Sequence, residues 1–230
     1  MESIVGELLA GNREHAASMD GAFDDLQDGQ TPAAVTVCCS DSRVLQNQMW
    51  KNETPGRIFT VGNIGNRVIE LIDHDPMITG DVLYPLAHTQ TRVALVIGHT
   101  ACGAITGAYE DLVYGIDDHP GIKYCLDVLE NDMAEALELL PAGIEDDTAI
   151  NYLVEYNVDQ QIRHLLNSPV VPDDTRVLGG VYDFCDVYPG KRGEVHLINI
   201  DGERDVTSLR DKYPAIADRI RRLWTDIPRE

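Results

Sequence analysis

Two clusters of cysteine, histidine and charged side chains are the residues of this sequence that could do chemistry. Cys39, Asp41 and Arg43 alternate within one segment, and His99 and Cys102 form an H-x-x-C pair much further along the chain. Two cysteines and one histidine are a ligand set that suits Zn²⁺ better than Mg²⁺ or Ca²⁺. Three protein ligands leave the fourth position of a tetrahedral zinc ion for water, as in catalytic sites. We therefore predict a catalytic zinc centre with Cys39, His99 and Cys102 as its ligands.

Both clusters directly follow apolar, β-branched segments, which are typical of strands buried in a parallel sheet. The five segments with this pattern are 33–39, 57–61, 92–98, 176–181 and 194–200. Helical patterns separate and flank them, at 2–17, 81–88, 101–114, 124–140, 148–167 and 213–224. Strands that alternate with helices predict an α/β fold with a mainly parallel central β-sheet flanked by helices. Because parallel strands end at one edge of the sheet, the two clusters should meet there.

Length and composition predict one domain without a membrane anchor. The chain has 230 residues, 43% of them hydrophobic and 25% charged, with no visible internal repeat or linker. We expect a single domain over residues 1–230, with a helical N-terminal arm over about residues 1–29. No apolar run reaches the roughly 20 residues of a membrane span, and the start shows no signal peptide. Five cysteines, an odd number, favour metal binding over a disulfide framework, so we predict a cytoplasmic protein.

Acidic residues dominate the charge of the chain. Thirty-nine Asp and Glu side chains against eighteen Lys and Arg give a formal net charge of −21. Nucleic acids and anionic membranes bind basic surfaces, so neither is expected as a partner. The basic residues are 14 arginines and only 4 lysines. A lysine-poor surface with acids scattered along the whole chain indicates adaptation to high salt, so we predict a halophilic source.

The two clusters resemble the signature of β-class carbonic anhydrases, which is C-x-D-x-R followed by H-x-x-C. Here they read CCSDSRV and GHTACGA. Further segments resemble family blocks, in the family's order, between residues 30 and 200: GQTPAAVTVCCSDSRV, PGRIFTVGNIGN, DVLYPLAHTQTRVALVIGHTACGAITG, VEYNVDQQIRHLLNSPVV and GGVYDF. The resemblance implies the β-carbonic anhydrase fold, one Zn²⁺ per chain and reversible hydration of CO₂ to bicarbonate and a proton. It also implies a homodimer or higher homo-oligomer, in which the N-terminal helix would embrace a partner.

Four residues match the substrate pocket of the plant-type subclass, namely Gln30, Phe59, Ile64 and Tyr84. In the family, the glutamine, phenylalanine and tyrosine of this pocket reach the zinc site across the dimer interface. The glutamine would donate a hydrogen bond to a substrate oxygen, and the apolar side chains would give CO₂ a dry wall. Bacterial-type members resemble the chain less, because they carry a tryptophan where Thr36 stands.

The resemblance implies that Asp41 and Arg43 are catalytic. Asp41 would accept a hydrogen bond from the zinc-activated water and orient its lone pair, while Arg43 holds the carboxylate. If Arg43 swings away, Asp41 can take the fourth zinc position and close the site. Two features depart from the family: Gly62 stands where an arginine is usual, and a second thiol, Cys38, precedes the first ligand. We expect Cys38 to face the other side of its strand as a buried thiol.

Three alternatives remain open. The same zinc ion with Asp41 and Arg43 could hydrolyse a CO₂ analogue such as carbon disulfide or carbonyl sulfide. A zinc-bearing but inactive binding protein is a second alternative, although a structural metal would not need the Asp41–Arg43 pair. A Cys39 nucleophile with His99 as its base is the third, and it would leave Cys102 without a role.

Overall fold

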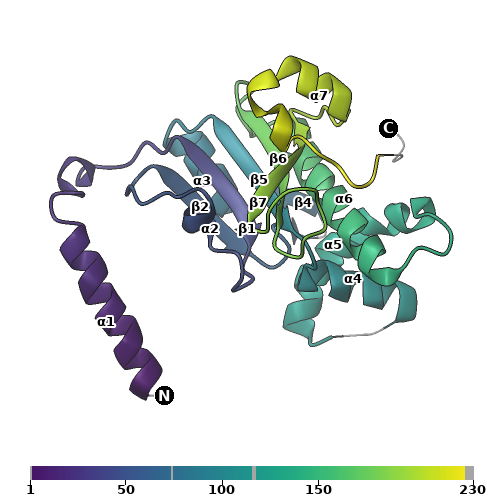
Figure 1. Cartoon of the computed structure of the whole chain (residues 1–230), viewed down its shortest axis with the longest axis horizontal. Helices are drawn as coiled ribbons and strands as arrows, with labels where there is room; N and C mark the ends of the chain where they lie inside the picture. The colour runs from purple at the N-terminus through teal and green to yellow at the C-terminus, as the bar shows by residue number, and fades with distance from the viewer. Residues whose placement is uncertain (1, 74, 116–117, 226–230) are drawn as a thin grey trace.

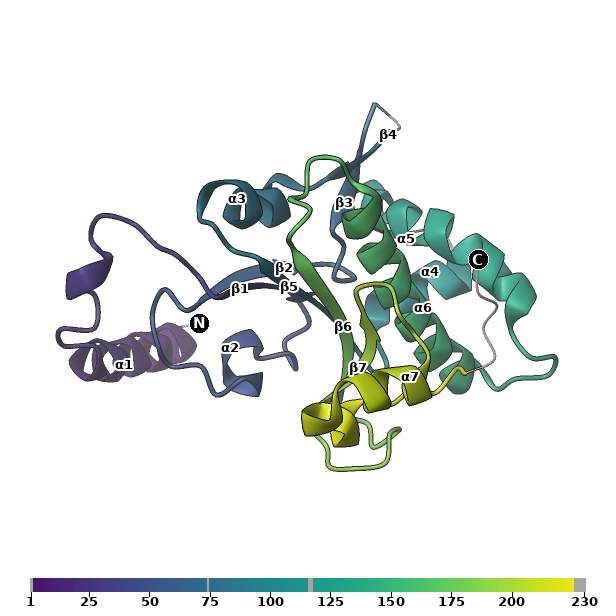
Figure 2. The same cartoon turned by 90° about the horizontal axis from the view of Figure 1, so that it is seen from above.

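Five strands form one central sheet in a computed structural model that describes residues 2–73, 75–115 and 118–225. The strand order is β2-β1-β5-β6-β7 (Figures 1 and 2). The strands are β1 (Ala34–Cys39), β2 (Ile58–Asn63), β5 (Val93–His99), β6 (Arg176–Asp183) and β7 (Glu194–Ile200). All pair in parallel except β7, which runs antiparallel along β6 at one edge. The predicted α/β fold with a mainly parallel sheet is confirmed, and each predicted strand is present.

Three helices lie on one side of this sheet and enclose the main core (Figure 2). They are α4 (Gly103–Tyr114), α5 (Pro120–Leu139) and α6 (Asp146–Asn167). α6 packs directly on β5 and β6, while α4 and α5 pack beside it. A Cβ atom at Gly98 of β5 would come within 2.9 Å of the methyl groups of Val154 and Val158. Glycine at this position therefore lets α6 approach the sheet closely.

Two short elements and one hairpin complete the body. α3 (Gly80–His88) packs against β1 and β2, as the pattern at 81–88 predicts. The pattern does not predict α2 (Gln46–Met49) or the antiparallel pair β3 (Ile69–Ile72) and β4 (Asp75–Ile78). Both strands are short, and β4 is largely exposed and contains a proline. Neither therefore shows the buried, alternating pattern by which a strand is recognised in a sequence.

The predicted helix over 213–224 is wrong. The chain instead forms α7 (Val206–Lys212), capped by the Asp205 carboxylate, and then a 3₁₀ helix over Pro214–Arg219. Between them Tyr213 adopts φ −126° and ψ 63°, outside the helical region. A residue that precedes proline is disfavoured in the α conformation, so one helix ends there and a new turn begins.

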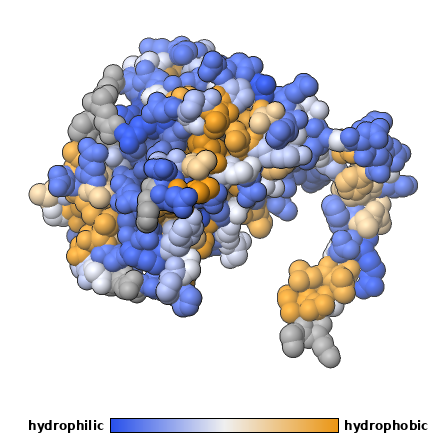
Figure 3. Space-filling view, turned by 180° about the vertical axis from the view of Figure 1, so that it is seen from behind, coloured by the Kyte–Doolittle hydropathy of each residue, from blue (hydrophilic) through white to orange (hydrophobic). Residues whose placement is uncertain are grey.

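The N-terminal helix α1 (Glu2–Ser18) projects from the body as the predicted arm (Figures 1 and 3). Several of its apolar side chains are exposed, namely Ile4, Val5, Leu8 and Leu9. In Figure 3 they form an apolar patch near the end of the arm. Across the described part of the chain, no helix combines the length and the apolar character that a membrane span requires.

Candidate metal centre

The three predicted ligands come together at the carboxyl edge of the sheet. Cys39 is the last residue of β1 and His99 the last residue of β5, and these strands are parallel neighbours. Cys102 follows in the turn that leads into α4. One ligand atom from each of the three lies within 4.8 Å of the other two, and all three residues are buried. The prediction that the two clusters meet at one edge of the sheet is confirmed.

The imidazole of His99 is oriented for a metal ion. Its Nδ1 lies 3.0 Å from the carbonyl oxygen of Thr100, which can only accept, so the proton is assigned to Nδ1. Its Nε2 is buried and has no hydrogen-bond partner among the described residues. A buried lone pair without a donor is costly, and a cation held beside the two sulfur atoms satisfies it. The donor set therefore fits a tetrahedral zinc ion with one open position.

Contact between the two thiols of the centre shifts their pKa values in opposite directions. The hydrogen bond from the Cys102 thiol is the main reason why the pKa of Cys39 falls to about 4, against the opposing effect of burial. The backbone N–H groups of Gly65 and Asp41 lower this pKa further. The same sulfur–sulfur contact raises the pKa of Cys102. One thiolate is thus already stabilised by the fold, and the second thiol would lose its proton if a zinc ion were held here.

Cys38, the neighbouring thiol, does not belong to this centre. It packs with Val44 and Ile97, whereas Cys39 belongs to the core cluster under α6. Successive residues of a strand point to opposite faces of the sheet, which explains the separation. Burial raises the pKa of Cys38 to about 12, so this side chain stays a thiol. The expectation of a buried thiol on the other side of the strand is confirmed.

Asp41 and Arg43 form a two-point ion pair beside the ligands. Arg43 donates from Nε to Oδ1 of Asp41 at 2.9 Å and from Nη2 to Oδ2 at 2.6 Å. These bonds, together with one from the backbone N–H of Arg43, hold the pKa of Asp41 far below its ordinary value. The carboxylate is therefore ionised, and its Oδ2 lies 3.9 Å from Nε2 of His99.

Of the four predicted pocket residues, only Ile64 lies at the metal edge of its own chain. It follows Asn63, which is the sheet partner of Cys39. Phe59 instead pairs with Val35, four positions before Cys39. At the rise of a parallel strand, this places Phe59 about 13 Å from the ligands along the sheet.

Tyr84 and Gln30 also lie away from the metal edge. Tyr84 is on α3, with its ring centroid 6.2 Å from that of Phe59, and it is exposed. Gln30 is exposed in the segment that leads into β1, at the end of the strand opposite to Cys39. One chain by itself therefore does not place these side chains beside the metal ligands.

Sequence reasoning missed two residues that contact this centre. The ring of Phe184 stacks on the ring of His99 and lies under the guanidinium of Arg43. Thr100 holds His99 through its carbonyl oxygen, and its hydroxyl oxygen accepts the N–H of Phe184. The place of Phe184 at the end of the GGVYDF segment is a weak signal, because an aromatic residue after a strand is more often part of the core.

The fold and the site together define a zinc-dependent enzyme, with an ionised carboxylate beside the open metal position. The family model described as carbonic anhydrase matches residues 34–188. A carbonic anhydrase of Emericella nidulans is 30% identical over 207 residues, which cover 87% of this chain and 86% of that protein. The chain therefore belongs to the carbonic anhydrase family.

Solved β-carbonic anhydrases share the fold. The Coccomyxa enzyme in complex with acetazolamide has a TM-score of 0.67 at 25% identity, covering 92% of this chain and 96% of that chain. A tetrameric β-carbonic anhydrase of Sordaria macrospora has a TM-score of 0.68 at 23% identity, covering 86% and 98%. The predicted β class, zinc cofactor and reversible hydration of CO₂ are confirmed by this family membership and by the Cys₂His centre.

Proposed function

We propose that Asp41, held by Arg43, is the residue that orients the attacking water during CO₂ hydration. Bound zinc supplies the acidified water that makes this attack possible near neutral pH. The observation that carries the proposal is the place of the Asp41 carboxylate, whose Oδ2 is bound by Arg43 and lies 3.9 Å from Nε2 of His99. An ionised carboxylate accepts hydrogen bonds and cannot donate one. Asp41 would therefore accept a hydrogen bond from the attacking water, which would turn a lone pair of that water toward CO₂.

Arg43 controls where the Asp41 carboxylate points. Its two bonds occupy both carboxylate oxygens, at 2.9 Å and 2.6 Å. In this paired arrangement both carboxylate oxygens are held by Arg43, so Asp41 would not act as a fourth ligand of a zinc ion held by Cys39, His99 and Cys102. Loss of the pair would free the carboxylate to turn toward the ligands and close the site. The two-point contact supports the open state as the resting state of this chain.

We propose that a second copy of the chain completes the substrate pocket. Gln30, Phe59 and Tyr84 lie away from the ligands of their own chain, which supports a role for them in the site of a partner. In that pocket the Gln30 amide would donate to a substrate oxygen and Tyr84 would form a polar rim. Phe59 and Ile64 would give CO₂ an apolar wall. The exposed apolar side chains of α1 and the tetrameric Sordaria macrospora relative support a homodimer or higher oligomer.

Four finer assignments complete the proposal. The four pocket residues support the plant-type subclass. The net charge of −21 and the low lysine content support a halophilic source. Five free cysteines support a reducing compartment such as the cytoplasm. The family match over 34–188, which covers the whole parallel part of the sheet, supports one domain preceded by a helical arm.

Stopped-flow CO₂ hydration in molar salt tests the role of Asp41. We expect Asp41→Asn to keep one zinc per chain and to lose about 100-fold in kcat/KM, because the water is no longer held in the reactive orientation. Cys39→Ser should lose the zinc ion and the activity together. Asp186→Asn, which changes an exposed acid, is the matched control and should behave as the parent. Full activity in zinc-loaded Asp41→Asn would contradict the proposal.

Mixed dimers test the shared pocket. When Asp41→Asn and Gln30→Ala subunits are unfolded together and refolded, half of the dimers should contain one of each. If Gln30 serves the partner's site, each mixed dimer holds one intact site, and roughly a quarter of the parental activity returns. If Gln30 serves its own chain, no site is intact and the mixture stays as inactive as its components.

A further inference from the structure

Phe184 lies between a metal ligand and the arginine of the ion pair. It directly follows β6, and its ring centroid is 5.5 Å from that of His99, at an interplanar angle of 26°. The guanidinium carbon of Arg43 lies 4.5 Å from the same ring centroid. A cation at this distance over an aromatic face is attracted by the quadrupole of the ring. One side chain thus contacts both the metal centre and the catalytic pair.

Buried hydrogen bonds fix the loop that carries Phe184. The carboxylate of Asp183 is buried and accepts three backbone N–H groups at 2.9–3.0 Å, those of Cys185, Val187 and Tyr188. It also accepts the hydroxyl of Thr100 at 3.2 Å. The oxygen of that hydroxyl accepts the N–H of Phe184, again at 3.2 Å. Because Thr100 is next to His99, the position of the ring is tied to the metal ligand itself.

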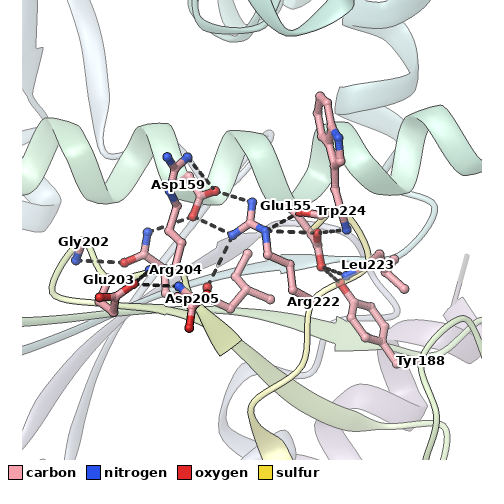
Figure 4. Close-up of polar contacts among 12 residues, drawn as sticks. Glu155, Asp159, Tyr188, Gly202, Glu203, Arg204, Asp205, Arg222, Leu223 and Trp224 are labelled. Carbon is pink, nitrogen blue, oxygen red and sulfur yellow. Dashed lines mark hydrogen bonds and ion pairs between the residues drawn. The ribbon is translucent and has the colours of Figure 1, made fainter. Parts of the chain in front are cut away.

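The far end of the same loop is anchored to α6 and to the C-terminal segment (Figure 4). Tyr188 donates its hydroxyl to Oε1 of Glu155 at 2.6 Å. The Glu155 carboxylate also accepts the backbone N–H groups of Leu223 at 2.8 Å and Trp224 at 2.9 Å. The loop is therefore held at both ends, which gives the ring of Phe184 a fixed position.

We propose that Phe184 is a positioning residue that keeps Arg43 paired with Asp41. The Arg43 side chain is 51% exposed, and an exposed ion pair by itself has only a small net free energy. The Phe184 ring attracts the Arg43 guanidinium with a free energy similar to that of the ion pair. It does so in the orientation in which Arg43 binds both carboxylate oxygens of Asp41. Without the ring, the population of unpaired Arg43 should rise roughly two- to five-fold. This inference rests on the proposed role of Asp41 in the reaction.

Phe184→Met tests the proposal, because methionine keeps a comparable volume but has no aromatic face. Phe184→Tyr keeps the ring and is the matched control. The Nε–Hε resonance of Arg43 in zinc-loaded protein reports the contact, and it is assigned by its absence in Arg43→Lys. In Phe184→Met we expect this resonance to lose its ring-current shift and to exchange with water roughly two- to five-fold faster. Phe184→Tyr should keep both properties.

CO₂ hydration gives the second readout. We expect kcat to fall in Phe184→Met at one zinc per chain and to be restored in Phe184→Tyr. If the shift and exchange rate of the Arg43 resonance are unchanged in Phe184→Met, or change equally in Phe184→Tyr, the Phe184 ring does not hold Arg43. A changed resonance with unchanged kcat would overturn its role in the reaction. Phe184→Leu repeats the test if the methionine variant does not fold.

These outcomes are separate from those for Asp41. If Asp41→Asn keeps full activity, the proposed role of Asp41 fails. The Arg43 resonance still decides whether Phe184 holds the arginine, because it does not depend on turnover.

Discussion

Arg222 neutralises two buried carboxylates, and its replacement by methionine should destabilise the folded chain strongly (Figure 4). Its Nη2 lies 2.5 Å from Oδ2 of Asp159, and its Nε lies 3.7 Å from Oε2 of Glu155. The Arg222 side chain is 2% exposed, Asp159 is 4% exposed and Glu155 is fully buried. Removing one partner of a buried ion pair costs about 3–5 kcal/mol, because the remaining charge is left uncompensated. We expect Arg222→Met to lose about this much free energy of unfolding, mostly at Glu155, since Arg204 still faces Asp159 at 3.7 Å.

The free energy of unfolding lost in Arg222→Met should increase with pH. Burial raises the pKa of Glu155, and Arg222 opposes this rise together with donors from Tyr188, Leu223 and Trp224. Without Arg222, the folded-state pKa rises further above the unfolded value of 4.5. Between these two values the folded chain binds a proton that the unfolded chain has released, so stability falls as pH rises. The deficit of Arg222→Met should therefore be smaller at pH 5 than at pH 8.

Urea unfolding at equal protein concentration, measured at both pH values, checks the size and the sign of this effect. Arg192→Met is the control, because this arginine is exposed, lies 4.0 Å from Asp186 and should matter by less than about 1 kcal/mol. Adding Glu155→Gln to Arg222→Met should recover part of the loss. A deficit below about 1 kcal/mol, or one that is equal at pH 5 and pH 8, would refute the compensation of Glu155 by Arg222.

Three further predictions concern packing, metal and salt. Gly179→Ala should lose about 1–3 kcal/mol in urea unfolding, because the new Cβ would collide with the side chains of Ile162 and Val158; a neutral effect would mean that α6 can move away from the sheet. Chelation of zinc should lower the Tm of the parent, because removal of the metal leaves the buried Nε2 of His99 without a partner. It should not change the Tm of a Cys102→Ser variant that holds no zinc. Equal melting of the parent with and without chelator would contradict this. Raising KCl from 0.1 M to 2 M should raise the Tm, since salt screens the repulsion within a chain of net charge −21; a Tm that falls would argue against adaptation to high salt.

The strands and the metal ligands could be predicted because both depend on local patterns. An apolar, β-branched run such as 33–39 favours a buried strand, and parallel strands end at a common edge. The two-residue period of a strand also separates Cys38 from Cys39. Ligand chemistry then selects zinc for two thiols and an imidazole.

Helix α6 shows where such patterns lose their information. Its apolar stripe predicts a helix over 148–167, and the observed helix begins two residues earlier, at Asp146. Polar side chains elsewhere on its surface, such as Glu155, Asp159 and Gln161, are nevertheless buried. They are covered by segments distant in sequence, for example by Val68, whose backbone N–H donates to Gln161. The periodicity of apolar residues shows which face of a helix is apolar. It does not show which other segments cover its polar faces.

The sequence by itself determined the fold class, through strand periodicity, and the candidate ligand set, through the donor chemistry of Cys39, His99 and Cys102. The reaction was predicted from the resemblance of the two motifs to those of β-class carbonic anhydrases. Tertiary structure alone decided that Phe184 meets Arg43, that Arg222 meets Glu155, and that Phe59 lies at the far end of the sheet from the metal. The first two are contacts between segments far apart in sequence, and the place of Phe59 follows from the register of β2 on β1.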